Sequence, residues 1–466
     1  MSFTSGRSRW SDVWLATAAR GIASCGDFLV ASALTLALQS AGAGGLAVSG
    51  VLLAATLPLV VLAPLTGRLA DRVDSRTILV AAGLAQAGIC LALAYAEHPA
   101  LVIVLVALLA AGLAATQPVI SALVPVMVRA ADLPRASALN QSAGTLGALA
   151  GPALAGLLVG QFGARPPLLL AAGSYLALVV AGLLIRTRRG GRRRAEPALP
   201  GGAVSATGWR LRQDPLLVAM VASVAGVIGA VGAINVVEVF FIRETLGSST
   251  TVYGLVTGAW TLGILAGGWL FARVVRRLDR DGPLVGAGLA LLGGCCLMVL
   301  ASAAAPAALL LVPIFLVGGV FNGGNNVFDT VLLARRVPEA ARGRAFAFFG
   351  ASVQGAAMVG YLAGGLLLEV AAPRPLVAAC GVAGLLVVAA VALPLRRASR
   401  AATPAVLEPA PAGPPPLAPD LVRKDPAPAG PPPLAPDLVR GDPAPAGSPP
   451  FASDLVRKDA APAGPA

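Results

Sequence analysis

Charge is the scarcest property of this sequence. Of its 466 residues only 12% are charged and 57% are hydrophobic, and the mean hydropathy is +0.81. Soluble globular proteins usually carry about 25% charged residues, so the composition excludes that class. The sequence predicts an integral membrane protein.

Histidine and cysteine are scarce as well. The one histidine, His98, lies beside Glu97 in an expected loop, which does not suggest a metal or catalytic cluster. The five cysteines are odd in number and fall in apolar segments, which argues against a disulfide framework or a zinc site. The sequence also has no GxxxxGK followed by Ser or Thr, so ATP-driven pumping is not supported. No nucleophile and base converge, and we expect neither an enzyme nor a bound cofactor.

Long apolar segments recur along most of the chain. A helix of about 20 such residues crosses roughly 30 Å of hydrocarbon, and backbone groups in lipid must be satisfied within the segment, so helices are expected. The first segment is too long for the apolar part of a signal peptide, and we expect it to be retained. The twelve expected spans are 13–38, 46–67, 77–96, 100–128, 138–162, 165–185, 215–242, 252–275, 283–304, 307–334, 344–370 and 375–395.

Arginine is distributed unevenly between the two sides of these spans. With the N-terminus placed inside, the inner segments carry 26 arginines, whereas the outer loops carry Arg165, Arg243 and Arg374. This bias predicts a multi-pass protein of the plasma membrane with both termini in the cytoplasm. It also accounts for the net charge of +13 without a nucleic-acid partner.

The longest inner segment divides the spans six and six. We therefore expect an all-α membrane protein with a cytoplasmic N-terminus (1–12), two pseudo-symmetric six-helix bundles (13–185 and 215–395) and a basic linker (186–214). The linker contains RTRRGGRRRAEPALPGG, and its basic residues are expected to attract anionic lipid.

A proline-rich tail occupies residues 396–466. From Glu408 to Lys458 it repeats with a period of 17 residues: EPAPAGPPPLAPDLVRK, DPAPAGPPPLAPDLVRG and DPAPAGSPPFASDLVRK. Proline at this density favours extended polyproline II, so we expect a disordered tail. Its PPPLAP stretch could dock onto a partner that binds proline motifs, but such composition specifies function loosely and favours a drifting repeat.

The loop between the second and third spans holds GRLADRVDSR at 67–76, followed by Leu79. This order closely resembles the signature of the major facilitator superfamily. The stretches RGIASCGD (20–27), GALAGPALAG (147–156) and RRVPEAARGRAFAFF (335–349) resemble the drug, enterobactin and macrolide efflux branch of that family. The resemblance covers 13–395 and implies a transporter, which we expect to be a monomer whose partners are a small-molecule substrate and the bilayer.

The resemblance also implies a cytoplasmic gate. Asp71 would accept backbone N–H bonds at the start of span 11, near Arg344, where the helix dipole favours an anion. Arg129, at the end of span 4, is the candidate ion-pair partner of Asp71. Three further residues complete the expected gate, namely Gly67, Arg72 and Arg76.

This motif departs from the family at two places, and at one of them the final basic pair is reduced to Arg76 followed by Thr77. Asp74 stands where the family has glycine. Glycine permits positive φ, and Asp is among the few other residues that tolerate it. We expect the turn to survive.

Four charged residues lie well inside expected spans, away from the span ends: Arg20, Asp27, Glu238 and Asp329. At that depth such a group normally faces a cavity or a partner. One hypothesis is that Asp27 exchanges a proton for substrate, with Glu238 or Asp329 assisting or binding a cationic group. The alternative for Asp27 is a structural ion pair with Arg20.

Neutral polar residues and glycines complete the candidate site. Gln117, Asn325 and Asn326 either line the path or hold helices together. The helix-packing motif consists of Gly147, Gly151, Pro152 and Gly156; its small residues let helices approach closely, and its proline can bend the helix.

The function expected from these features is secondary active transport. The proton gradient would drive the export of a hydrophobic or amphipathic small molecule, such as a drug, an antibiotic or a siderophore-like metabolite. Two alternatives stay open, an importer and a non-transporting sensor or scaffold that acts through the tail.

Overall fold

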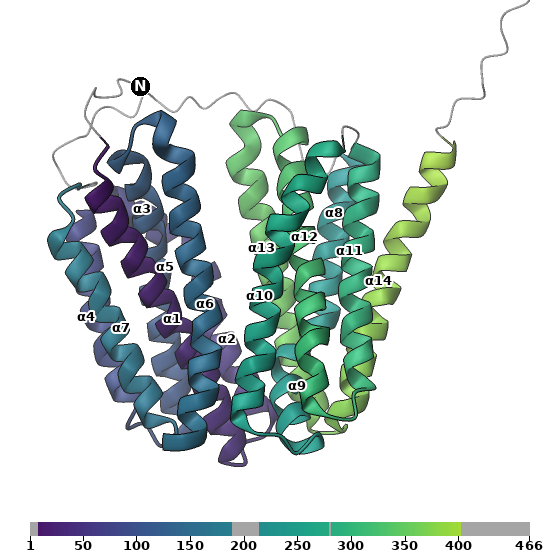
Figure 1. Ribbon diagram of the computed structural model, residues 1–466, viewed down its shortest axis with the longest axis horizontal. Coiled ribbons are helices and arrows are strands. Elements are labelled where there is room, and N and C mark those ends of the chain that lie inside the picture. Colours follow the sequence, from purple (N-terminus) through teal and green to yellow (C-terminus); the bar gives the residue numbers. More distant parts are fainter. Residues whose placement is uncertain (1–7, 189–213, 279–280, 402–466) are drawn as a thin grey trace, which may run out of the picture. The chain divides into compact units, whose positions relative to one another are not determined.

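The computed structural model describes residues 8–188, 214–278 and 281–401, and every regular element in these ranges is helical (Figure 1). The predicted all-α fold is confirmed. The repeat tail and most of the basic linker lie outside the described residues. The first half contains α1 (Trp10–Ser40), α2 (Gly45–Val61), α3 (Ala63–Arg72), α4 (Ser75–Leu93), α5 (Pro99–Met127), α6 (Leu133–Phe162) and α7 (Arg165–Leu184). The second half contains α8 (Pro215–Val231), α9 (Ile234–Phe240), a π-helical segment (Phe241–Thr245), α10 (Thr250–Val274), α11 (Asp281–Ala303), α12 (Leu311–Arg336), α13 (Glu339–Leu368) and α14 (Pro373–Ala401).

Eleven helical stretches in the described part are long and apolar enough to cross a membrane, and α2 is a shorter apolar helix of 17 residues. The expected span 46–67 is divided at Leu62 between α2 and α3. Pro64, in the first turn of α3, accounts for the break because proline has no backbone N–H to donate to a continuing helix.

Helix α13 begins at Glu339, not near Arg344 as expected. Hydropathy alone missed this first turn because it contains Glu339 and Arg342. A helix can begin directly after a proline, and Pro338 is the N-cap residue here. The start of α13 is therefore set by Pro338, while the apolar run begins later.

The two halves form two bundles with matching internal contacts. In the first bundle α1 packs on α6 and α7, α4 packs on α5 and α7, and α2 packs on α5. In the second bundle α8 packs on α13 and α14, α11 packs on α12 and α14, and α10 packs on α12. Each contact has its counterpart in the same order along the chain, so the second bundle repeats the architecture of the first.

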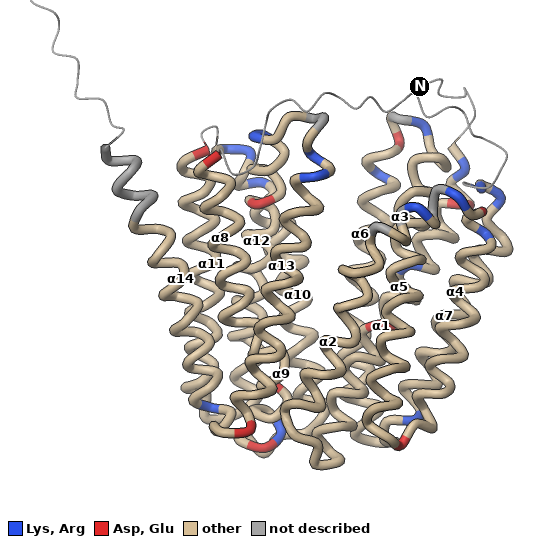
Figure 2. Tube along the Cα trace, turned by 180° about the vertical axis from the view of Figure 1, so that it is seen from behind, with Lys and Arg blue, Asp and Glu red and all other residues tan. Residues whose placement is uncertain are grey.

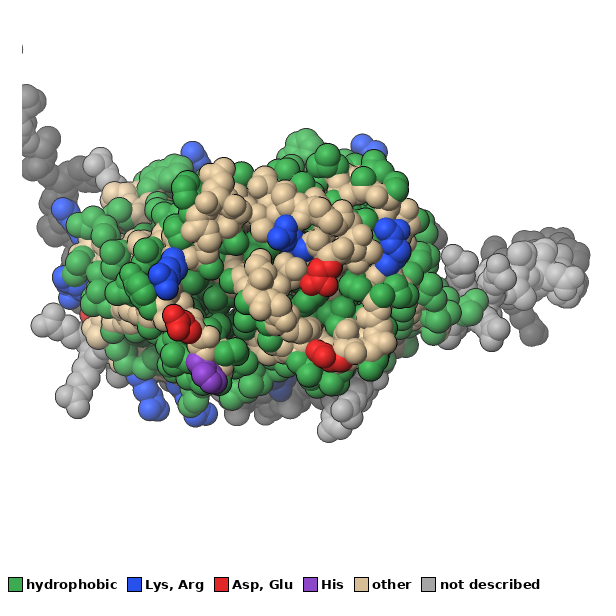
Figure 3. Space-filling view, turned by 90° about the horizontal axis from the view of Figure 1, so that it is seen from below, with side chains coloured by type: hydrophobic (Ala, Val, Ile, Leu, Met, Phe, Trp, Pro, Cys, Tyr) green, Lys and Arg blue, Asp and Glu red, His purple; other side chains and the backbone are tan. Residues whose placement is uncertain are grey.

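The two ends of the bundles differ in charge. Helices α1, α4, α6, α8, α11 and α13 all begin at one end, where most arginines of the described residues gather (Figure 2). We call this the basic end and the opposite one the far end. Few charged side chains lie on the surface at the far end (Figure 3).

The bundles contact each other through α6 with α10 and through α2 with α13. These contacts involve the last turns of α6 and α13 and the first turns of α2 and α10, so they lie at the far end (Figure 1). Glycine allows the close approach: a Cβ on Gly254 of α10 would lie 2.6 Å from the carbonyl oxygen of Pro152 and 3.2 Å from the Cα of Gly156. Ser49 of α2 likewise lies against Gly365 of α13.

Candidate functional site

Asp27 lies in the middle of α1 and is half-buried. The hydroxyl of Tyr175, a fully buried residue of α7, donates to its Oδ1 at 2.6 Å. Arg20 lies seven residues earlier, about two turns nearer the basic end, and no ion pair joins it to Asp27 among the described side chains. The polar partner of Asp27 is therefore a neutral hydroxyl on a neighbouring helix.

Arg20 lies at the seam between α1 and α6. A Cβ on Gly144 would come within 3.0 Å of its Nε, so glycine makes room for the guanidinium. Three buried polar atoms along this seam have no hydrogen-bond partner among the described residues: Arg20 Nε, Thr17 Oγ1 and Asn140 Oδ1. Buried polar groups normally find partners, so this seam is the least satisfied polar region of the first bundle. The sequence alone does not identify Thr17 and Asn140, because a single Thr or Asn in an apolar span carries no distinct pattern.

Glu238 belongs to α9, which continues α8 after a break at Gly232 and Ala233. Its Oε1 lies 3.3 Å from the hydroxyl of Thr257 in α10, which also lies 3.0 Å from the carbonyl oxygen of Tyr253 and has one proton to donate between the two. The span that was expected to be one helix, 215–242, is therefore broken and ends in a π-helical segment. Such irregularities often occur at functional sites, and in transporters they mark discontinuous helices near the binding site.

The break beside Glu238 has a structural cause. Gly232 packs against the backbone of Gly360 in α13, where a Cβ on Gly360 would lie 2.8 Å from the Cα of Gly232. The side chain of Asn235, which is exposed, donates to the carbonyl oxygen of Gly232 at 3.1 Å. The signal available in the sequence was the run GAVGAIN at 229–235, with two glycines and an asparagine inside an apolar span.

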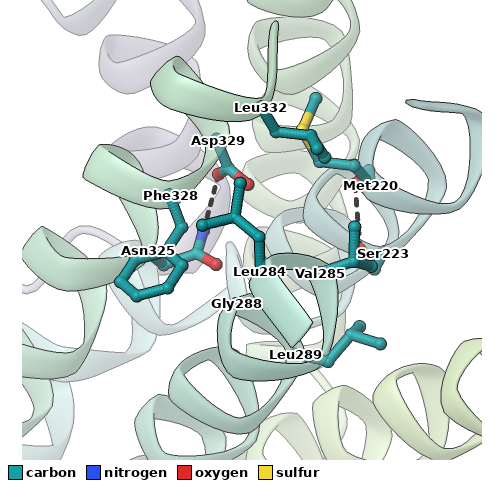
Figure 4. A pocket seen from close by; sticks show the side chains of 10 residues that line it. All are labelled: Met220, Ser223, Leu284, Val285, Gly288, Leu289, Asn325, Phe328, Asp329 and Leu332. Carbon is teal, nitrogen blue, oxygen red and sulfur yellow. Dashed lines mark hydrogen bonds between the residues drawn. The ribbon is translucent and has the colours of Figure 1, made fainter. Parts of the chain in front are cut away.

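Asp329 and Asn325 of α12 are buried one turn apart, and the amide of Asn325 donates to Asp329 Oδ2 at 2.7 Å (Figure 4). They line a small cavity inside the second bundle. Asn326, in contrast, is exposed and contacts Asn322 at 3.4 Å. Gln117 of α5 is also exposed. The four predicted polar residues therefore divide into a buried pair and two exposed side chains.

The expected gate residues lie at the basic end. Asp71 and Gly67 belong to α3, but the side chain of Asp71 is outside the described part of the molecule. Arg72 is exposed and Arg76 is half-buried. Arg129 forms an ion pair with Asp132 at 3.5 Å, within its own bundle.

Asp74 has an ordinary negative φ of −59° and serves as the N-cap residue of α4, accepting from the backbone N–H of Arg76 at 2.8 Å. Its Oδ2 lies 3.9 Å from Arg188. The turn therefore does not need a positive φ at Asp74. Asp supplies a cap at this position, which glycine cannot supply through a side chain.

The glycine motif of α6 contacts two different helices. Cβ atoms on Gly147 and Gly151 would meet the backbone of α1, at Cys25 N and Leu29 N, both at 2.8 Å. Gly156 instead faces α10, and the carbonyl oxygen of Pro152 belongs to the same contact with Gly254. The motif therefore joins α6 to its own bundle through one part and to the other bundle through the next.

A polar cluster at the far end was missed. Gln39, near the end of α1, donates to Glu244 Oε1 at 3.2 Å and accepts from Arg243 Nε at 3.3 Å. Arg243 and Glu244 belong to the π-helical segment of the second bundle. The hydroxyl of Thr250 also donates to the carbonyl oxygen of Gly156 at 2.9 Å. These bonds join the bundles, and sequence separations of about 100 to 200 residues left no local signal.

Two repeated bundles of membrane-spanning helices, each with a carboxyl group in mid-span, define a multi-pass membrane protein built from two pseudo-symmetric halves. The sequence profile of the Major Facilitator Superfamily matches residues 16–328 and 228–430. The chain belongs to this superfamily. No curated protein matches the chain in sequence.

Several solved structures share the fold. The nucleoside transporter NupG has a TM-score of 0.64 at 14% identity, covering 84% of this chain and 98% of its own. A bacterial homologue of the iron transporter ferroportin, in an inward-facing state, has a TM-score of 0.63 at 18% identity, with 83% and 99% covered. A bacterial homologue of the human lysosomal transporter Spinster, inward-facing and unoccupied, has a TM-score of 0.63 at 12% identity, with 85% and 96% covered. At these identities the likeness shows the fold alone.

Proposed function

We propose that this protein is a secondary active transporter that exports a hydrophobic or amphipathic small molecule in exchange for protons. The observation that carries the proposal is a carboxyl group within a membrane-spanning stretch of each bundle, Asp27 and Glu238, that lies within hydrogen-bond distance of a neutral hydroxyl. Asp27 is held by Tyr175 and Glu238 by Thr257. A carboxyl group paired with a hydroxyl can gain or lose a proton without leaving an unpaired cation in a poorly hydrated interior, where such a charge is costly.

Exposed polar side chains in mid-span support a substrate path between the bundles. Gln117 of α5, Asn235 of α9 and Asn326 of α12 are all exposed. Contact with lipid would be costly for such groups, which normally face a bundle interior or a water-filled cavity. We assign these three side chains to the path, with Asp27 as the proton carrier and Glu238 as its counterpart in the second bundle.

The contacts between the bundles support an alternating mechanism. They close the far end in the state observed, through glycine contacts of α6 with α10 and the cluster around Gln39. In the opposite state the basic end would close, with Asp71 at the start of α13. Arg129, which now pairs with Asp132, would then be available to Asp71.

The remaining assignments follow the sequence. The arginine bias supports a plasma-membrane protein with the basic end and both termini in the cytoplasm. The efflux direction rests on the resemblance of RGIASCGD and GALAGPALAG to exporters of this superfamily. We propose a monomer with no resident cofactor, whose energy source is the proton gradient.

Two linked experiments test this function. Growth inhibition by a panel of amphipathic antibiotics and dyes, measured in cells with and without the protein, identifies candidate substrates. Each candidate is then added to inverted vesicles energised by a pH gradient. Accumulation that stops when the gradient is collapsed supports the proposal, whereas uptake that is indifferent to the gradient contradicts proton coupling.

A further inference from the structure

The cavity beside Asp329 has features that proton exchange at Asp27 does not use. It lies between α8, α11 and α12, inside the second bundle (Figure 4). The cavity has a volume of about 10 Å³. This is room for about one water-sized particle. Three oxygen-bearing side chains line it, namely Ser223, Asn325 and Asp329, and each is at least 96% buried.

The hydrogen bonds around the cavity leave acceptors free. Asn325 donates its amide to Asp329 Oδ2, so Asn325 Oδ1 points away from that bond, and a Cβ on Gly288 would lie 3.7 Å from it (Figure 4). Ser223 donates its one proton to the carbonyl oxygen of Met220 at 2.9 Å, so its hydroxyl faces other groups as an acceptor. A carboxylate, an amide oxygen and a hydroxyl oxygen are ligands that hard cations prefer.

The charge of the cavity lining favours a monovalent cation over a divalent one. The cavity is lined by one carboxyl group, and its other lining residues are apolar or neutral. A monovalent cation neutralises that carboxylate, whereas a divalent cation would leave a net positive charge in a bundle interior, where charge is costly. No cluster of three or more His, Cys, Asp or Glu side chains occurs among the described residues. A proton would also neutralise Asp329, but it would leave the acceptors of Asn325 and Ser223 without a partner.

An ion-pair cluster lies on the same three helices, nearer the basic end than the cavity. Arg336, one turn beyond Leu332 of the cavity, binds Asp214 before α8 at 2.6 Å and Asp281 at the start of α11 at 2.8 Å. Asp214 also caps α8 by accepting from the backbone N–H of Leu216 at 3.1 Å. Arg336 therefore joins the start of α8, the start of α11 and the end of α12 at the basic-end side of the cavity.

We propose that this cavity is a binding site for one monovalent cation of the size of sodium, coordinated by Asp329, Asn325 and Ser223. The site lies in the second bundle and does not include Asp27. The cation site can therefore be tested separately from proton-coupled export.

Binding to the purified full-length protein tests the proposal without a transport assay. Radioactive sodium binding is measured by scintillation proximity, and the melting temperature is measured in sodium, potassium or choline chloride at equal ionic strength. We expect about one sodium bound per chain and a melting temperature at least about 2 °C higher in sodium than in choline. Potassium should give a smaller shift than sodium, because the cavity has room for about one water-sized particle.

Three variants locate the site. Asp329→Asn keeps the shape of the side chain and should abolish sodium binding. Ser223→Ala removes one oxygen without a change in charge and should weaken binding roughly tenfold. Glu238→Gln, a carboxyl change in the same bundle outside the cavity, should bind sodium like the unaltered protein.

Two results would overturn the proposal. One is the same melting temperature in sodium and choline with no sodium bound, in which case the cavity holds water. The other is sodium binding that survives in both Asp329→Asn and Ser223→Ala, which would place the cation elsewhere.

Discussion

The contact between α6 and α10 makes a quantitative prediction about the conformational equilibrium. Replacing Gly254 with Val adds a branched side chain whose Cβ would lie 2.6 Å from the carbonyl oxygen of Pro152 and 3.2 Å from the Cα of Gly156. Both neighbours are backbone, which cannot rotate away. Relief requires the two helices to separate at the far end.

The size of the effect follows from the cost of overpacking. Inserting side-chain atoms into a well-packed contact costs about 1–3 kcal/mol. This cost falls on the state in which the far end is closed, because the other state separates these helices. The ratio of the two states should therefore shift by about 5–150-fold toward the state closed at the basic end.

Spin-label distances measure this shift directly. Labels are placed at Ser137→Cys on α6 and Ala272→Cys on α10, two exposed positions at the basic end, after replacement of the five native cysteines. Gly254→Val should move the distance distribution toward shorter values.

The matched control lies on the same helix. A Cβ on Gly268 of α10 would meet no atom within 4 Å, so Gly268→Val introduces the same side chain without the clash. Identical distance distributions for the two variants would refute the argument that the far-end contact holds this state.

Three further predictions concern the first bundle. Asp71→Asn should insert normally and lower the initial rate of transport, and an undiminished rate would exclude a gate role for Asp71. Asp74→Ala should lower the free energy of unfolding by about 0.5–2 kcal/mol in thermal or denaturant melts, because it removes the N-cap of α4. Asp74→Asn should retain most of that free energy, because Asn can also cap a helix. Equal losses of stability in the two variants would point to the exposed ion pair with Arg188 instead. Tyr175→Phe should destabilise the protein by about 1 kcal/mol, and by clearly less when Asp27 is already Asn; equal costs in both backgrounds would show that the hydrogen bond between them contributes nothing.

The sequence predicted the spans and the division into halves because these depend on local composition. Twenty apolar residues specify a membrane helix wherever they occur, and the arginine distribution predicts which end of each helix lies on the cytoplasmic side. It could not predict the break at Gly232, because that depends on the close approach of Gly360 from another helix. The start of α13 was misplaced for a local reason, since charged residues occupy its first turn.

The candidate site was predictable residue by residue but not in its pairings. Asp27 stood out as a charge in an apolar span, and its depth required a partner. The sequence suggested Arg20 at a helical spacing, whereas the structure provides Tyr175, 148 positions away. Likewise nothing in the sequence connects Asp329 with Ser223, which share a cavity only because α8 and α12 lie together in the folded bundle.

Proton movement in sealed proteoliposomes tests the central claim most directly. A pH-sensitive dye is trapped inside the vesicles, and an exported compound identified by the susceptibility panel is added outside. The unaltered protein should change the internal pH when the compound is added, while Asp27→Asn, present at equal density in the vesicles, should bind the compound but leave the pH constant. Transport of the compound by Asp27→Asn with the same proton flux as the unaltered protein would contradict the account.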